Sequence, residues 1–176
     1  MSDASIEHHK AKHLLAHVLA AAGAKRWPEA IRGRSGETAS GFFADLGLAG
    51  LPTPEEIETL ADDMARLLRD VQVFRELELT PAQALAAHAG QPWKRFHIEA
   101  IAESEERIRC LELDGFTDVC DCALKDPSEL LALHPEKFQL TDAHPIVWTH
   151  RGQDRFFIRI KGELFPAVTP CACCAP

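Results

Sequence analysis

Four histidines lie within ten residues near the start of the chain, in the stretch HHKAKHLLAH at 8–17. His9, His13 and His17 are spaced by four residues, so on a helix they form one stripe, and adjacent members can converge on one point. An HxxxH pair can hold a divalent metal or place two imidazoles around a substrate. Lys10 stands where a zinc-protease helix carries its general base, so that base is missing. The alternative is that these histidines are solvated side chains on a helix surface.

The elements that must position these residues begin with a helix. Apolar residues recur near the helical period over 5–22, which predicts an amphipathic helix carrying the histidine stripe. TPEE at 53–56 is a capping box with proline at the first helical position, and it predicts a helix to about Asp70. TPAQ at 80–83 predicts a second, shorter helix in the same way. A further short helix is expected over 94–102.

Strands are predicted mainly in the second half of the chain. Alternating apolar and polar residues indicate strands at 71–79 and 107–114, with a further segment at 115–121 after a turn, and a hairpin between 138–149 and 155–162. The apolar stretch at 41–48 indicates either a strand or a turn at the edge of a pocket. Helices therefore come early and strands late, which favours an α+β fold in two layers, with a largely antiparallel sheet packed against the long N-terminal helix. We expect residues 1–165 to form a single domain and residues 166–176 to form a cysteine-rich tail.

Composition and charge restrict the class of protein. The 176 residues are 46% hydrophobic, and no apolar run approaches the ~20 residues that span a bilayer. A secretory signal is not evident, so we expect a cytoplasmic protein with neither membrane nor DNA as partner. The net charge of −8 opposes binding to a phosphate backbone, so any contact with nucleic acid must be local or supplied by a partner. The best local candidate is a basic run that can equally be a solvated face: Lys10, Lys12, Lys25, Arg26, Arg32 and Arg34.

Several short segments occur in an order that is typical of one family. They are HKAKHLLAH (9–17), GFFADL (41–46), LPTPEEIETLADDMARLL (51–68), GQPWK (90–94), FTDVC (116–120), FQLTDAHPIVW (138–148) and RIKG (159–162). Together they resemble the editing domain of bacterial threonyl-tRNA synthetase, a relative of the editing module of alanyl-tRNA synthetase. The resemblance covers about residues 5–165 and implies that fold. We expect a free-standing relative, without the ubiquitin-like module and the aminoacylation core.

The resemblance implies hydrolysis of a mischarged aminoacyl-tRNA in trans, with serine on a threonine tRNA as the family's error. The family pattern is HxxxH with a distant CxxxH. His9 and His13 match the first pair, Cys120 matches the cysteine, and Leu124 stands where the last histidine is expected. The implied partner is the acceptor end of an aminoacyl-tRNA, and a synthetase is a further partner to consider.

Two more residues acquire roles by the same resemblance. Asp118 matches the acid before the cysteine and would bind the ammonium group of the amino acid, while Lys94 would stabilise the oxyanion or hold the ribose and phosphate. The implied catalytic residues are therefore His9, His13, Lys94 and Cys120, and the implied substrate-binding residues are Asp118 and Lys94. The ordinary alternatives are a surface lysine, a turn aspartate and a buried small cysteine.

Metal binding is an alternative role for the same positions. The alanyl branch of the family binds zinc with its four residues, so His9, His13 and Cys120 can supply three ligands with water as the fourth. Cys122 is a candidate for the missing ligand, although CxC on a strand sends its sulfurs to opposite faces. The threonyl branch, which the chain matches better, works without metal. A soft-metal site in the tail is a weaker candidate, with Cys171, Cys173 and Cys174 as its ligands.

Two other functions remain open. One is a hydrolase or binding protein for another small substrate with an amino group, for which Leu124 favours a more apolar ligand. The other is a non-catalytic protein that keeps the fold and binds a synthetase or another protein. The remaining histidines are expected to be structural or exposed, outside the pocket: His8, His17, His88, His97, His134, His144 and His150.

Overall fold

The structure is a computed structural model that describes residues 3–120, 138–150 and 152–165, with side chains from residue 9 onward. Its elements, in chain order, are α1 (Asp3–Arg26), β1 (Ile31–Glu37), β2 (Gly41–Gly47), α2 (Pro54–Asp70), β3 (Phe74–Leu79), α3 (Pro81–Ala87), α4 (Pro92–Ala102), β4 (Ile108–Leu113), β5 (Phe116–Val119), β6 (Phe138–His150) and β7 (Gln153–Leu164). Most predicted elements are present within a few residues of their expected bounds.

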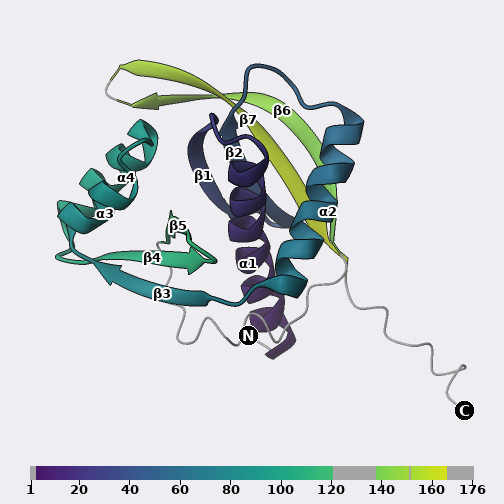
Figure 1. Cartoon of the computed structure of the whole chain (residues 1–176), viewed down its shortest axis with the longest axis horizontal. Coiled ribbons are helices and arrows are strands. Elements are labelled where there is room, and N and C mark those ends of the chain that lie inside the picture. The colour runs from purple at the N-terminus through teal and green to yellow at the C-terminus, as the bar shows by residue number, and fades with distance from the viewer. Residues whose placement is uncertain (1–2, 121–137, 151, 166–176) are drawn as a thin grey trace, which may run out of the picture.

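The strands form two antiparallel sheets. The larger sheet has the order β1-β2-β7-β6, and the smaller has the order β3-β4-β5. Helices α1 and α2 lie across the same face of the larger sheet, and α3 and α4 lie beside the smaller one (Figure 1). The predicted α+β class, with antiparallel sheet packed against a long N-terminal helix, is confirmed.

Helix α1 is more deeply buried than an amphipathic helix would be. Apart from His13, every residue from 11 to 23 is buried, because α1 packs against β1, β2 and α2 and also touches β4 and β7. Its leucines Leu14, Leu15 and Leu19 join the main core, and its alanines allow neighbouring elements to approach closely. His17 and most of His13 therefore lie inside the protein, where a polar side chain needs a partner.

Strand β1 was not predicted, because its sequence IRGRSGE shows no clear alternation of apolar residues. Its pairing with β2 depends on Gly33, where a Cβ atom would lie 2.8 Å from the Cβ of Asp45. A bulge between Arg32 and Ser35 shifts the register of this pair. Burial of β1 against α1 and α4 overrides its weak strand propensity.

Both predicted capping boxes are present. The backbone N–H of Glu56 donates to Thr53 Oγ1, and the Glu56 side chain accepts from the Thr53 N–H at 2.7 Å. Thr80 and Gln83 make the equivalent pair of bonds at the start of α3. These bonds satisfy N–H groups that would otherwise lack partners at the helix N-termini.

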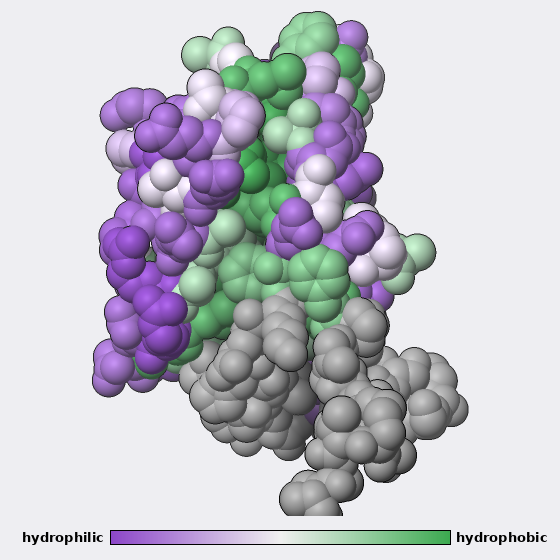
Figure 2. All heavy atoms as spheres, turned by 90° about the vertical axis from the view of Figure 1, so that its right-hand side faces the viewer, coloured by the Kyte–Doolittle hydropathy of each residue, from purple (hydrophilic) through white to green (hydrophobic). Residues whose placement is uncertain are grey.

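Helix α2 closes the core at the β6 edge of the larger sheet. Ile57 and Ala61 of α2 and Ala143 of β6 pack against the core. Viewed from the side of α2 and β6, a band of hydrophobic residues runs between hydrophilic ones (Figure 2). Within the described part of the chain, no helix is long and apolar enough to cross a membrane.

Candidate active site

Two histidines of α1 and a cysteine after β5 form a compact cluster. The Nε2 atom of His13 lies 3.2 Å from the Sγ atom of Cys120 and 3.2 Å from the Nε2 atom of His17. The two imidazole rings meet edge to face, with centroids 4.7 Å apart. The donor atoms of all three residues lie within 4.8 Å of one another. The helix places His13 and His17 on one face, four residues apart, and β5 brings the cysteine to them.

Each histidine is oriented by a carboxylate. The Nδ1 atom of His13 lies 3.3 Å from Glu37 Oε1 of β1, and the Nδ1 atom of His17 lies 3.2 Å from Asp118 Oδ2 of β5. Because a carboxylate accepts, each Nδ1 carries its hydrogen, an assignment made from these partners. Both Nε2 atoms are thereby directed toward Cys120.

Asp118 connects three elements at the base of the cluster. Its side chain is 1% exposed, and its Oδ1 atom lies 2.5 Å from the ammonium of Lys94, on α4. Ser35 Oγ donates to Oδ2 at 2.7 Å, the same oxygen that faces His17. Burial alone would raise the pKa of Asp118, but the charge of Lys94 and the hydrogen bond from His17 hold it well below its usual range. Asp118 is therefore an ionised carboxylate that fixes Lys94 and His17.

The charge state of the histidines follows from these partners. Burial disfavours the charged form of His13, but its contacts with Cys120 and Glu37 raise its pKa to about 9. Burial acts in the same direction on His17, and the hydrogen bond to Asp118 raises its pKa. A hydrogen bond between the two Nε2 atoms requires one of them to be unprotonated, so both rings cannot be charged while they share it. While this bond is formed, at most one of the two rings is therefore charged.

The prediction that His17 lies outside the pocket is wrong. Its side chain is 5% exposed and contacts both His13 and Asp118. His9 instead has a side chain that is 63% exposed, and its Nδ1 atom lies 2.5 Å from Glu37 Oε2. The converging donors are thus His13, His17 and Cys120, and not the expected set of His9, His13 and Cys120. His9 can act only at the mouth of the cluster.

The predicted basic run does not form one surface. Lys12 is buried and donates to the carbonyl oxygens of Thr38 and Ala39. The Arg32 guanidinium donates to Thr117 O, and Arg26 pairs with Asp63. These three side chains have structural contacts that hold them in place.

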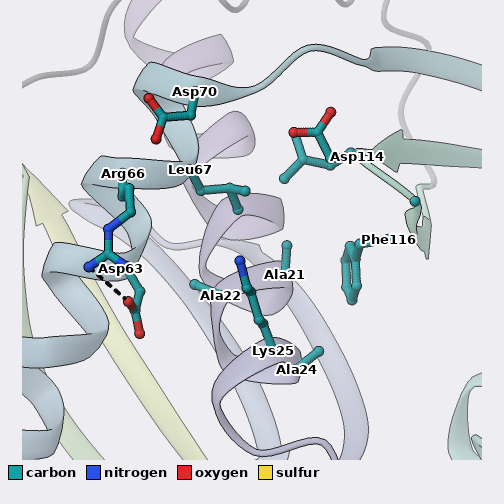
Figure 3. Close-up of a pocket in the computed structure, with 12 residues that line it drawn as sticks. Ala21, Ala22, Ala24, Lys25, Asp63, Arg66, Leu67, Asp70, Asp114 and Phe116 are labelled. Carbon is teal, nitrogen blue, oxygen red and sulfur yellow. Dashed lines mark ion pairs between the residues drawn. The ribbon is translucent and has the colours of Figure 1, made fainter.

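Lys25, from the same run, belongs to a different region. It points into a cavity of about 520 Å³ between the end of α1, the end of α2 and the turn joining β4 to β5 (Figure 3). The Arg66–Asp63 ion pair and the side chains of Asp70 and Asp114 line its rim. None of the cluster residues lines this cavity, so it is separate from the candidate site.

Some predicted positions lie outside the described residues. They are Cys122, Leu124, His134 and the tail cysteines Cys171, Cys173 and Cys174. Among the other histidines, His88 is buried with its Nδ1 atom 2.9 Å from Ala84 O, and His144 and His150 contact Asp142 and Phe96.

Comparison with known proteins identifies the relatives of this chain. No protein-family model matches it. The threonine–tRNA ligase of Borrelia hermsii is 25% identical over 157 residues, which is 89% of this chain and 26% of that protein. That of Dehalococcoides mccartyi is 29% identical over 154 residues, covering 88% and 25%. That of Leifsonia xyli is 39% identical over 83 residues, covering 47% and 12%. The chain is a relative of the threonine–tRNA ligases.

This threonine–tRNA ligase relative spans about a quarter of the length of the proteins it matches over most of its own length. The resemblance predicted from its motifs is thereby confirmed. Of the positions implied by that resemblance, the structure brings together His13, Lys94, Asp118 and Cys120 and leaves His9 at the edge.

Three contributors to the site were missed by sequence reasoning: Ser35, Glu37 and His17. Two of them are on β1, the strand that was not predicted. The available indication for His17 was its place in the four-residue stripe, and none pointed to the other two. Their roles depend on contacts between residues that are far apart in the sequence, such as His17 and Asp118, which are 101 positions apart.

Proposed function

We propose that the chain hydrolyses the ester bond of an aminoacyl-tRNA, acting as a deacylase at the cluster of His13, His17 and Cys120. The observation that carries this proposal is the convergence of these residues with the buried Lys94–Asp118 pair. The match to one segment of threonine–tRNA ligases supports it and makes a seryl ester on a threonine tRNA the first substrate to test.

The charge state of the site indicates which residues donate, accept or position protons and charges in the proposed reaction. His13 is protonated at neutral pH, so it serves as a hydrogen-bond donor and acid rather than as a base. Glu37 is the carboxylate beside it, with a side chain 16% exposed, and can accept a proton from water. Asp118 has both oxygens engaged, so we assign it a positioning role toward Lys94 and His17 in place of direct contact with the substrate ammonium.

The reaction then balances as follows. Water adds to the ester carbonyl carbon and gives a proton to Glu37, while His13 donates a proton to the ribose oxygen that leaves. The products are the free amino acid and the ribose hydroxyl of the tRNA. Glu37 and His13 regain their starting protonation by exchange with solvent, and Lys94 adds positive charge near the developing oxyanion.

The donor chemistry of the cluster also fits a zinc ion. His13, His17 and Cys120 would hold it, and each histidine already has the carboxylate partner that commonly orients a zinc-bound imidazole. When bound, zinc polarises a carbonyl or lowers the pKa of a water. Metal analysis of the purified protein tests this directly, because Cys120→Ser and His17→Ala should each lower zinc content relative to wild type, and His144→Ala should not.

The function itself is tested by incubating the protein with Ser-, Ala- and Thr-charged tRNA. We expect release of one amino acid above the spontaneous rate, lost by about 100-fold or more in His13→Ala and Lys94→Ala. Lys25→Ala, in the separate cavity, serves as the matched lysine control and should keep full activity. No turnover of any charged tRNA would overturn the proposal.

A second candidate is hydrolysis or binding of another small substrate with an amino group. The carboxylate of Glu37, beside the exposed His9 at the mouth of the site, favours a cationic group there. Turnover of a free amino-acid ester without turnover of charged tRNA would select this alternative.

A further inference from the structure

The larger sheet has an outer face, which is the face opposite to α1 and α2. In β2, Phe42 and Ala44 are buried toward the helices, so Phe43 and Asp45 point to the outer face. Their cross-strand partners on β7 are Lys161 and Arg159. Farther along the β6–β7 pair, the partners Trp148 and Arg155 lie on the same face. We call these six residues, together with Arg34 of β1, the outer sheet face.

Two arginines of the outer sheet face lie over aromatic rings. The Arg159 guanidinium carbon is 3.9 Å from the ring centroid of Phe43, and that of Arg34 is 5.2 Å from the ring of Trp148. Stacking of this kind holds a guanidinium flat while its edge can still donate hydrogen bonds.

The charge of this face is positive although the protein is acidic. Asp45 is buried and receives two hydrogen bonds from Arg159, at 2.7 and 2.9 Å, so its charge is compensated. Arg34 and Arg155 are exposed, and Lys161 is 39% exposed. Asp142 lies opposite Lys161 on β6, and the exposed Glu163 lies two residues along β7 on the same face, so with Asp45 three acids stand against the four cations Arg34, Arg155, Arg159 and Lys161. The excess of cations on one face contrasts with the net charge of −8 for the chain.

We propose that the outer sheet face binds the unpaired 3′ end of an RNA and leads it to the candidate site. Cations interleaved with flat aromatic and guanidinium groups suit phosphates and stacked bases, and they suit an acidic protein surface less well because such a surface offers no bases to stack. This inference rests on the proposed function, since the RNA in question is that of an aminoacyl-tRNA.

Strand β1 supplies the physical connection between this face and the site. Arg34, at the bulge, lies over Trp148, while the next residue, Ser35, donates to Asp118 at 2.7 Å. Along β1, the basic face and the cluster are therefore contacted by two adjacent residues, Arg34 and Ser35.

The test measures binding of a labelled RNA hairpin with an unpaired 3′ end, and of the same hairpin with a blunt end, over ~50 to ~200 mM salt. The test variant is Arg34→Gln/Arg155→Gln. The matched control is Lys25→Gln/Arg66→Gln, which removes the same charge from the separate cavity. Hydrolysis of seryl-adenosine, an ester without phosphates, is measured in parallel.

We expect the hairpin with the unpaired end to bind more tightly than the blunt one. Log affinity decreases with log salt concentration, and in the test variant this decrease should be less steep. The slope should become smaller in magnitude by about 1.4, which is about 0.7 for each lost contact with single-stranded RNA. The control variant should bind as wild type does. Hydrolysis of seryl-adenosine should be equal in all three proteins, because neither variant touches the cluster.

The outcomes separate this inference from the proposed function. Hairpin binding that is unchanged in the test variant overturns the inference about the outer sheet face. Turnover of seryl-adenosine in the same experiment still supports the proposed function. Loss of RNA binding in the test variant with no ester turnover by any form supports the face and overturns the function. A change in the protein's mass in solution, with RNA binding unchanged, would assign the face to a second copy of the chain and overturn the inference.

Discussion

Replacing Lys94 by methionine removes the counter-charge of Asp118, a carboxylate that is 1% exposed, and keeps a side chain of similar length. Loss of one partner of a buried ion pair costs about 3–5 kcal/mol, because the remaining charge is left in a medium of low polarity. Asp118 keeps hydrogen bonds from Ser35 and from the backbone N–H of Val119, and its contact with His17. We therefore expect the lower end, a loss of about 3 kcal/mol in the free energy of unfolding.

The assay is urea denaturation at neutral pH, on wild type, Lys94→Met, Asp118→Asn and the double variant. The double variant should be about 2 kcal/mol more stable than the sum of the two single losses predicts. The reason is that the buried charge of Asp118, which Lys94→Met leaves without its counter-charge, is then absent. Lys25→Met is the matched control and should change stability by no more than about 0.5 kcal/mol, since Lys25 is exposed.

The pH dependence of the free energy of unfolding tests the direction of the pKa shift of Asp118. The folded-state pKa of Asp118 lies below its usual value near 3.8, so the stability that this carboxylate contributes is present above pH 3.8 and is lost as the pH falls below it. Asp118→Asn should remove that part of the acid dependence. A loss of less than about 1 kcal/mol in Lys94→Met, or strict additivity in the double variant, would refute this description of the buried pair.

Three further outcomes are expected. The folded pKa of His13, about 9, lies above the ordinary 6.5, so its stabilisation is complete below pH 6.5 and is lost as the pH rises through 9; His13→Gln should flatten the stability profile over that range, and an unchanged profile would contradict the assignment. Gly41→Ala should cost more than about 2 kcal/mol by thermal denaturation, because its Cβ would lie 1.9 Å from Gly162 O, whereas Gly50→Ala, with open space, should be nearly neutral. Thr53→Ala should cost about 1 kcal/mol by losing the α2 cap, and restored stability in Thr53→Ser would support that cause.

The local features of the fold were predictable from sequence. Both TP capping boxes gave the helix starts, because the bonds that cap a helix join residues three positions apart. The β6–β7 hairpin was predictable from its turn and alternation. Strand β1 was not, since its pairing depends on glycines that fit against other strands and on burial beneath α1 and α4, which local sequence does not encode.

The site was predictable only in outline. The spacing of His9 and His13 indicated a pocket motif, and the resemblance supplied Lys94, Asp118 and Cys120. The partner of His13 on α1 proved to be His17, because the deep burial of α1 turns that part of the stripe inward while His9 reaches the surface. Which of His9 and His17 joins His13 in the interior depends on how deeply α1 is buried. The apolar pattern alone predicted a helix with only one buried face.

The most direct test of the site is the rate at which Ser-charged threonine tRNA releases serine in the presence of His17→Gln and of His9→Gln. His17 lies within the cluster, whereas the exposed His9 contacts Glu37 at its mouth. We predict that His17→Gln lowers the wild-type rate by about 100-fold or more and that His9→Gln changes it by no more than about threefold. The reverse order, or a wild-type rate equal to the spontaneous one, would contradict the proposed site.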